Sequence, residues 1–341
     1  MTNTVASASR RLLAFALTAA ALAFAGCGGG TPPTDATTGL TAVKFQTDWY
    51  AQAEHGGYYQ AAADGTFAAQ GLDVDILQGG PGAFVTQKVA TGQVQFGMGR
   101  SDDIMLAVNE GLPLVIVCAL MQHDPQALLL HADDPANSFA DLDGRTVMTT
   151  PGAAWITYVE KRHGISFNVI PINYGLAQFM SDPRFIQQCF ITNEPYFVRQ
   201  NGGNPKTLLI ASSGYDPYRV IFTSKKFARE NPDVVRAFVA ASIAGWETFL
   251  HGDSAPGKAL IIERNDKMTP EFVDFSIQAM KDAQLVGGDP AKGERIGLLN
   301  RGRMQRLSES LAQLGVLPAV MPLEDFVSFD FLPPELAPLA Q

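Results

Sequence analysis

Several residues that could bind a small molecule follow short apolar stretches that are predicted as strands in this chain of 341 residues. Trp49 follows the first of these strands, and His55 stands at the start of the helix predicted next. Gly80 follows the second strand, and Ser101 and Asp103 follow the third. In open α/β sheets, ligands bind beyond the carboxyl ends of the strands, where helix N-termini point. These five residues are therefore candidates for a ligand site.

A second group of candidates comes from later in the chain. Asn193 and Glu194 follow another predicted strand, and Tyr215, Asp216 and Tyr218 precede a further one. The two groups would face each other if the chain forms two α/β domains with a cleft between them. The loop at residues 150–152 would hold an equivalent place in the second domain.

The residue types in this predicted cleft favour a flat ligand that is neutral or partly cationic. Trp49 and Tyr215 could stack on a ring, and Glu194 could accept a hydrogen bond from an amino group or a protonated ring nitrogen. A desolvated anion needs donors and opposite charge, whereas Arg100 is the single cation among the candidates. The sequence therefore favours a heteroaromatic ligand over a sulfonate, a nitrate or a phosphate.

Some of these residues also have a purely structural interpretation. Trp49 could pack beneath a loop, and Tyr218 could be a packing residue. Gly80 could serve only a turn that needs a positive φ. Tyr58 and Tyr59 are adjacent in the predicted helix and cannot both face the cleft.

Strands and helices are predicted to alternate along the rest of the chain. A helix should begin at the His55-Gly56-Gly57 sequence and end before Gly71, and another should cover residues 101–109. After Tyr218 we expect a strand and then a helix with Pro232 in its first turn. No repeat of fixed period is visible, which argues against solenoids and propellers.

Four short motifs in this order resemble one family of proteins. They are Asp48-Trp49, Thr192-Asn193-Glu194-Pro195, Gly214-Tyr215-Asp216-Pro217-Tyr218 and the sequence GDSAPGKALI at 252–261. Over residues 43–315 the chain resembles extracytoplasmic solute-binding proteins of the thiamine-pyrimidine and alkanesulfonate type. The resemblance implies a type II periplasmic binding protein fold, with two α/β domains and a ligand cleft between them. Domain 1 would comprise residues 42–132 and 217–341, and domain 2 residues 133–216, with crossings near 132–137 and 212–218.

The resemblance also implies a function. Such a protein captures a small ligand, here a heteroaromatic such as a thiamine pyrimidine precursor, and passes it to the permease subunits of an ABC importer. It is expected to act as a monomer without a cofactor. Riboflavin or a sulfonate- or nitrate-type anion is the alternative ligand, and a sensor module could use the same fold.

An enzyme is the other alternative, because eukaryotic relatives make the thiamine pyrimidine themselves. Those relatives carry a Cys-rich iron-binding run and a cofactor-linked His. At the matching positions this chain has Tyr215 to Arg219, without Cys, and Asp103. No G-x-S-x-G motif occurs either. An enzymatic function is therefore not expected.

The N-terminal residues resemble a bacterial lipoprotein signal. Arg10 and Arg11 precede an apolar stretch at 12–25 that ends in Ala25-Gly26-Cys27 and is too short to span a membrane comfortably. We expect cleavage after residue 26, lipid on Cys27 and a flexible tether at 27–41, which would place the protein in the periplasm on a lipid anchor. An uncleaved membrane anchor is the alternative.

Composition narrows the class of protein further. The formal net charge is −9, and removal of the two arginines of the signal would make it −11, which argues against nucleic acid as a partner. Cys118 and Cys189 lie in apolar stretches and are expected to be free and buried. The spacings of common zinc sites do not occur, so no metal is expected.

Overall fold

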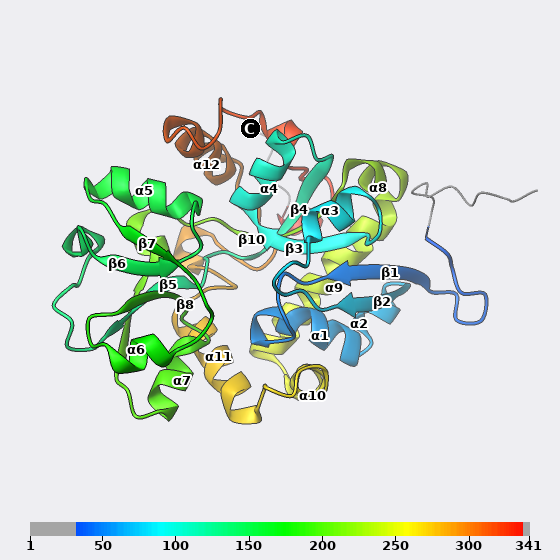
Figure 1. Ribbon diagram of the computed structural model, residues 1–341. Helices are drawn as coiled ribbons and strands as arrows, with labels where there is room; N and C mark the ends of the chain where they lie inside the picture. Colours follow the sequence, from blue (N-terminus) through cyan, green and yellow to red (C-terminus); the bar gives the residue numbers. More distant parts are fainter. Residues whose placement is uncertain (1–31, 337–341) are drawn as a thin grey trace, which may run out of the picture.

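The computed structural model describes residues 32–336 and shows two lobes, each built on a five-stranded mixed sheet (Figure 1). The sheet of the first lobe has the strand order β2-β1-β3-β10-β4, and the sheet of the second lobe has the order β7-β6-β8-β5-β9. The strands are β1 (Thr41–Gln46), β2 (Leu72–Leu77), β3 (Phe96–Arg100), β4 (Leu114–Met121), β5 (Gln126–His131), β6 (Thr146–Thr149), β7 (Asn168–Pro171), β8 (Ile186–Phe190), β9 (Pro205–Leu209) and β10 (Arg219–Ser224).

Helices pack against both sheets and also connect the two lobes (Figure 1). The α-helices are α1 (Gly56–Ala63), α2 (Thr66–Ala69), α3 (Val85–Ala90), α4 (Ser101–Asn109), α5 (Ala154–His163), α6 (Ala177–Ser181), α7 (Glu194–Gln200), α8 (Lys225–Glu230), α9 (Pro232–His251), α10 (Ala255–Arg264), α11 (Pro270–Asp282) and α12 (Arg301–Gln313). Short 3₁₀ helices include η1 (Ala53–His55) and η3 (Ile210–Ser213). Among the described residues, no helix is both long and apolar enough to cross a membrane.

The two sheets share one topology. In the first, β1 pairs in parallel with β2 and β3, and β10 runs antiparallel between β3 and β4. In the second, β6 pairs in parallel with β7 and β8, and β5 runs antiparallel between β8 and β9. In each sheet, the antiparallel strand is therefore the first strand that the chain forms after it crosses from the other lobe. The predicted architecture of two α/β lobes is confirmed.

The first crossing lies earlier in the chain than the sequence suggested. We expected residues up to 132 to belong to the first domain, but β5 pairs with β8 and β9 of the second sheet. The chain therefore crosses at residues 122–125 and not at 132–137. An apolar strand that is buried on both faces gives no indication of which sheet it joins, which explains the difference. The second crossing, at 214–218, falls within the expected range.

The start of α1, which follows the loop that carries Trp49, is held by a close contact with α9. A Cβ atom on Gly57 would lie 2.1 Å from Cγ of Trp246, and one on Gly245 would lie 2.2 Å from the carbonyl oxygen of Gly57. Only glycine lets the two helices approach this closely. Aromatic rings fill the space between the helices and the sheet, where Phe96 stacks on Phe238 with centroids 4.1 Å apart.

Two local expectations differ from the structure. The helix expected to run from His55 to Gly71 is two helices, because Gly65 adopts a left-handed conformation (φ 80°) between α1 and α2. The end of the expected tether is a hydrogen-bonded turn, in which the backbone N–H of Ala42 donates to Pro33 O and Thr34 bridges to Thr41. The predicted signal peptide, Cys27 and the first part of the predicted tether lie outside the described residues.

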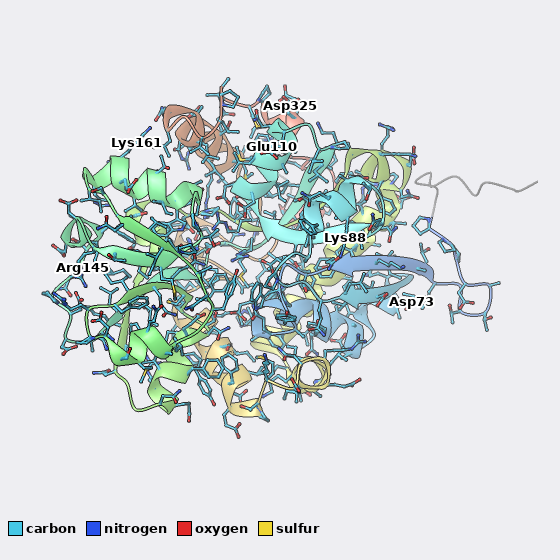
Figure 2. All side chains as sticks on the ribbon, in the orientation of Figure 1. Asp73, Lys88, Glu110, Arg145, Lys161 and Asp325 are labelled. Atoms are coloured by element: carbon cyan, nitrogen blue, oxygen red, sulfur yellow. The ribbon has the colours of Figure 1, made fainter. Side chains whose placement is uncertain are left out.

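The last helices bridge the two lobes. Ser276 of α11 donates a hydrogen bond from Oγ to Thr192 O in the second lobe (2.7 Å). Lys161 of α5, labelled in Figure 2, donates from Nζ to Leu314 O at the end of α12 (2.7 Å). The contacts on both sides hold the lobes in the arrangement that forms the cleft.

Candidate functional site

A cavity of about 660 Å³ lies between the two lobes. This volume is within the range of about 300 to 1,000 Å³ that is usual for small-molecule sites. From the first lobe it is lined by Asp48, Trp49, Gln52, Gly99, Arg100, Asp103 and Arg219. From the second lobe its wall includes the loop at 150–153 and residues Gln126, Tyr174, Gln188, Phe190, Asn193, Glu194 and Phe197. The carboxyl ends of β1, β3, β6 and β8 meet at this cavity, as the topology requires.

Aromatic rings from both lobes meet at one side of the cavity. The ring of Trp49 lies 5.2 Å from that of Tyr174 in the second lobe and 5.5 Å from that of Tyr50. Tyr174 has a positive φ of 59°, which is uncommon for a bulky residue, and 59% of it is exposed. Asn173 Oδ1 accepts a hydrogen bond from Gly175 N and supports this turn. The Trp49–Tyr174 pair therefore joins the lobes across the cleft.

A buried ion-pair network lies beneath Trp49. Arg219 contacts Asp48 through Nη1 and Asp124 through Nε (3.1 Å), and its guanidinium lies 4.9 Å from the centroid of the Phe190 ring. Asp48 Oδ1 lies 2.9 Å from His55 Nε2. Burial alone would raise the pKa of Asp48, but Arg219 and His55 outweigh it and lower that pKa to about 2. Asp48 is thus a carboxylate, and its charge compensates Arg219.

The second arginine in the cleft is also paired. Arg100 Nη2 donates to Asp102 Oδ2 (2.6 Å), and Arg100 Nη1 donates to Gln126 Oε1 (2.8 Å). Asp102 is fully buried and also accepts a hydrogen bond from the Tyr215 hydroxyl. Asp103 Oδ2 lies 3.4 Å from Arg100 Nε, and desolvation raises the pKa of this carboxyl above its ordinary value. Carboxylates therefore neutralise both arginines that line the cleft.

The opposite wall is formed by the start of α7. The carboxylate of Glu194 accepts a hydrogen bond at Oε2 from Phe190 N (2.8 Å). Desolvation raises the pKa of Glu194 to about 7, and Glu54 adds to the rise. Glu54 lies deeper, where its carboxyl accepts from the Thr192 hydroxyl, and burial raises its pKa as well. Glu194 can thus change its charge near neutral pH at the surface of the cavity.

Four of the predicted site residues line the cavity, namely Trp49, Asp103, Asn193 and Glu194. Three others from the first lobe lie outside the lining. His55 is fully buried, and its Nε2 contacts Asp48 Oδ1. Ser101 is fully buried and accepts a hydrogen bond from Tyr218 N, and Gly80 packs against the Tyr50 ring.

The three candidates from the second crossing also lie outside the lining. Tyr215 is buried against Asp102, and Tyr218 is buried beneath the guanidinium of Arg303 at 3.9 Å. Asp216 contacts His123 and Arg303. These three side chains pack against other parts of the hinge and do not enter the cavity.

Sequence reasoning missed several lining residues. Tyr174 and Phe197 line the cavity but were not among the candidates, although Tyr174 directly follows the strand predicted at 169–173. Arg219 is the first residue of β10 and enters the cavity at the edge where the parallel strands end, since β10 is antiparallel to β3. The antiparallel direction of β10 was the signal that could have identified Arg219. Gln188 lies within β8, and it could be identified only by knowing which side chains of that strand point toward the cavity.

The cavity is also lined by one thiol. Cys189 lines the cavity, and Cys118 lies in the core; both are free and buried, and burial raises the pKa of each thiol. Within residues 32–336, no group of three or more His, Cys, Asp or Glu side chains is placed to hold a metal ion.

The fold is shared with known periplasmic proteins. The periplasmic aliphatic sulphonate binding protein SsuA from Escherichia coli superposes with a TM-score of 0.66 at 12% identity, covering 84% of this chain and 92% of SsuA. Identity this low shows the fold alone. Together with the two lobes and the cleft between them, it establishes a periplasmic binding protein fold.

The chain belongs to the NMT1/THI5 like family, whose model matches residues 52–255. It is 25% identical over 242 residues to the formylaminopyrimidine-binding protein of Halalkalibacterium halodurans, covering 68% of this chain and 73% of that protein. It is 27% identical over 276 residues to the riboflavin-binding protein RibY of Chloroflexus aurantiacus, covering 74% of this chain and 71% of RibY. The family resemblance seen in the sequence is confirmed.

Proposed function

We propose that this protein is the solute-binding component of an ABC importer and that it captures a flat heteroaromatic ligand with an amino group, such as a thiamine pyrimidine precursor. The observation that carries the proposal is the arrangement of Trp49, Tyr174 and Glu194 around one cavity. A ring could enter between the two aromatic side chains, while the Glu194 carboxylate accepts a hydrogen bond from the amino group.

The charges in the cleft support a ligand without a strong negative charge. Arg100 and Arg219 each pair with buried carboxylates, so an anion would have to compete with Asp102 or with Asp48 and Asp124 for them. Breaking such buried pairs leaves carboxylates without partners, which is costly. An amino group instead gains from the carboxylates that face the cavity.

Riboflavin is the second candidate ligand. A cavity of about 660 Å³ has room for a larger ring system than a pyrimidine, and the similarity to RibY extends over 276 residues. A sulfonate or nitrate would need one of the arginines. Calorimetric titration with an aminopyrimidine, riboflavin, taurine and nitrate separates these classes, and tight binding of taurine or nitrate alone would contradict our proposal.

The protein is expected to bind its ligand without converting it chemically. The relatives named above are named as binding proteins, whereas the eukaryotic relatives that the sequence resembles make the thiamine pyrimidine themselves. If the protein only binds, a bound ligand should be recovered with unchanged mass after prolonged incubation. A product formed in proportion to protein and time would establish an enzyme. Co-purification with permease subunits, as opposed to a signalling receptor, would separate an importer from a sensor module.

We further propose that the protein is an extracytoplasmic lipoprotein, anchored through Cys27 and monomeric. The supporting observation is the apolar stretch that ends in Ala25-Gly26-Cys27. Mass spectrometry of the protein extracted from membranes should find an N-terminus at Cys27 carrying acyl chains. An intact Met1 or an unmodified Cys27 would contradict it.

Ligand binding is expected to close the cleft and stabilise the protein. A ligand that contacts Trp49 in one lobe and Glu194 in the other has higher affinity for the closed state. The radius of gyration from solution scattering should fall, and the melting temperature should rise. A ligand at 100 times its Kd adds about 2.7 kcal/mol to stability. A tight ligand that leaves the scattering curve unchanged would contradict closure about the two crossings.

A further inference from the structure

A cluster of charged side chains joins the two crossing segments on the side of the hinge away from the cavity lining. His123 lies in the first crossing and Asp216 in the second, with His123 Nδ1 2.6 Å from Asp216 Oδ2. Asp216 Oδ1 also accepts a hydrogen bond from Asp124 N (3.0 Å). Any movement of one lobe against the other must change the backbone of these two segments, so the cluster lies where closure takes place.

The C-terminal part of the chain completes the cluster. Glu294 Oε2 lies 3.0 Å from His123 Nε2 and also accepts a hydrogen bond from Asp289 N (2.8 Å). Arg303 of α12 contacts Asp216 Oδ2 at 3.0 Å and Glu294 Oε1 at 3.6 Å. The four charged side chains are each about one-fifth exposed, which limits screening by water.

The geometry determines the protonation state of His123. Both ring nitrogens face carboxylate oxygens, and a carboxylate can only accept. Both nitrogens must therefore donate, which only the imidazolium can do. A neutral ring would direct a lone pair at Asp216 or at Glu294. With an imidazolium and Arg303 opposite two carboxylates, the cluster carries no net charge.

The charges around His123 favour the same state. The hydrogen bond to Asp216 is the main cause that raises the pKa of His123, and Glu294 adds to it, while burial and Arg303 oppose the rise. The carboxyl group of the neighbouring Asp124 is directed instead to Arg219. The backbone N–H of His123 donates to Leu285 O.

We propose that the proton on His123 is a pH switch of the hinge, fastening both crossing segments to the C-terminal chain when present and releasing them when lost. The inference is independent of the proposed ligand. Because the pKa of His123 is raised in this arrangement, the stabilisation is complete below the ordinary value of about 6.5 and is lost as pH rises through the raised value. Each unit by which this pKa differs between two hinge conformations changes their ratio by about tenfold.

Two measurements on the intact, ligand-free protein test the switch. An NMR titration should find that the pKa of His123 lies above 6.5, and Glu294→Gln should move its titration to lower pH. Hydrogen exchange at residues 122–125 and 214–218, corrected for its intrinsic pH dependence, should accelerate as pH passes the His123 titration. His123→Gln should remove this step.

A matched control and two outcomes decide the test. His251 is exposed, and its Nε2 lies 3.9 Å from an exposed carboxylate of Glu247 on the same helix. His251→Gln therefore removes a histidine that has no contact with the hinge, and it should keep the wild-type exchange profile. Titration of His123 at or below pH 6.5 would overturn the proposal. So would a hinge step that persists unchanged in His123→Gln, or, if that variant does not fold, in Glu294→Gln.

Discussion

Replacing Trp49 by alanine should weaken ligand binding by about 1 to 3 kcal/mol, or roughly 5- to 150-fold in Kd, by analogy with the stacking of bases on aromatic side chains. The ring lines the cavity and contacts Tyr174 of the opposite lobe, so its removal takes away both a stacking surface and a contact between the lobes. Calorimetric titration with an aminopyrimidine and with riboflavin measures the change. The free energy of unfolding should change little, because Trp49 lies at the end of a strand and outside the core.

Tyr50→Ala provides the matched control. Tyr50 is the neighbouring aromatic residue and contacts the Trp49 ring, but it is half exposed and does not line the cavity. We expect its removal to change affinity far less than the removal of Trp49. Equal losses for the two variants would show that the loop as a whole matters and not the ring in the cavity.

Glu194→Gln should weaken binding of an amino-substituted ligand and make it independent of pH around neutrality. The pKa of Glu194 is raised to about 7, so in the wild type the carboxylate that accepts the hydrogen bond forms only as pH rises through this value. If only the ionised form binds well, affinity should increase roughly tenfold between pH 6 and pH 8. Glutamine has a similar volume and no charge, and should give weak binding at both pH values.

Asp103→Asn separates this effect from the other carboxyl group in the cavity. Desolvation raises the pKa of Asp103 to about 6, so its titration lies below that of Glu194. The Asp103→Asn variant should therefore keep the roughly tenfold increase in affinity between pH 6 and pH 8. Loss of that increase in Asp103→Asn, with its retention in Glu194→Gln, would assign the pH dependence to Asp103.

The sequence predicted the local elements better than their connections. The helix at 101–109 and the proline-started helix α9 agree with the structure, because their apolar spacing and end signals are local. The membership of β5 in the second sheet could not be predicted in the same way. The middle of that strand, residues 127–130, is apolar and buried, and its partners β8 and β9 lie about 60 to 80 residues later in the chain.

The same distinction applies to the site. Trp49 and Glu194 could be placed because each follows a strand that ends at the cavity. Tyr215 and Tyr218 have the residue types of ligand contacts, yet tertiary packing buries them against Asp102 and Arg303. Whether a side chain at a crossing faces the cavity or the interior depends on these tertiary contacts, and residue type does not encode them.

The exchange of antiparallel strands between the sheets also determines the order in which the protein can fold. Because β10 lies between β3 and β4, the first sheet stays split into two parts until Ser224 is available, although its other strands end by Met121. The second sheet has all its strands by Leu209. A nascent chain that stops before Arg219 exposes two unpaired strand edges, on β3 and on β4, where other chains could pair. The lobe that begins first is therefore the last to be completed, and truncation within β10 should prevent its folding while leaving every strand of the second sheet present.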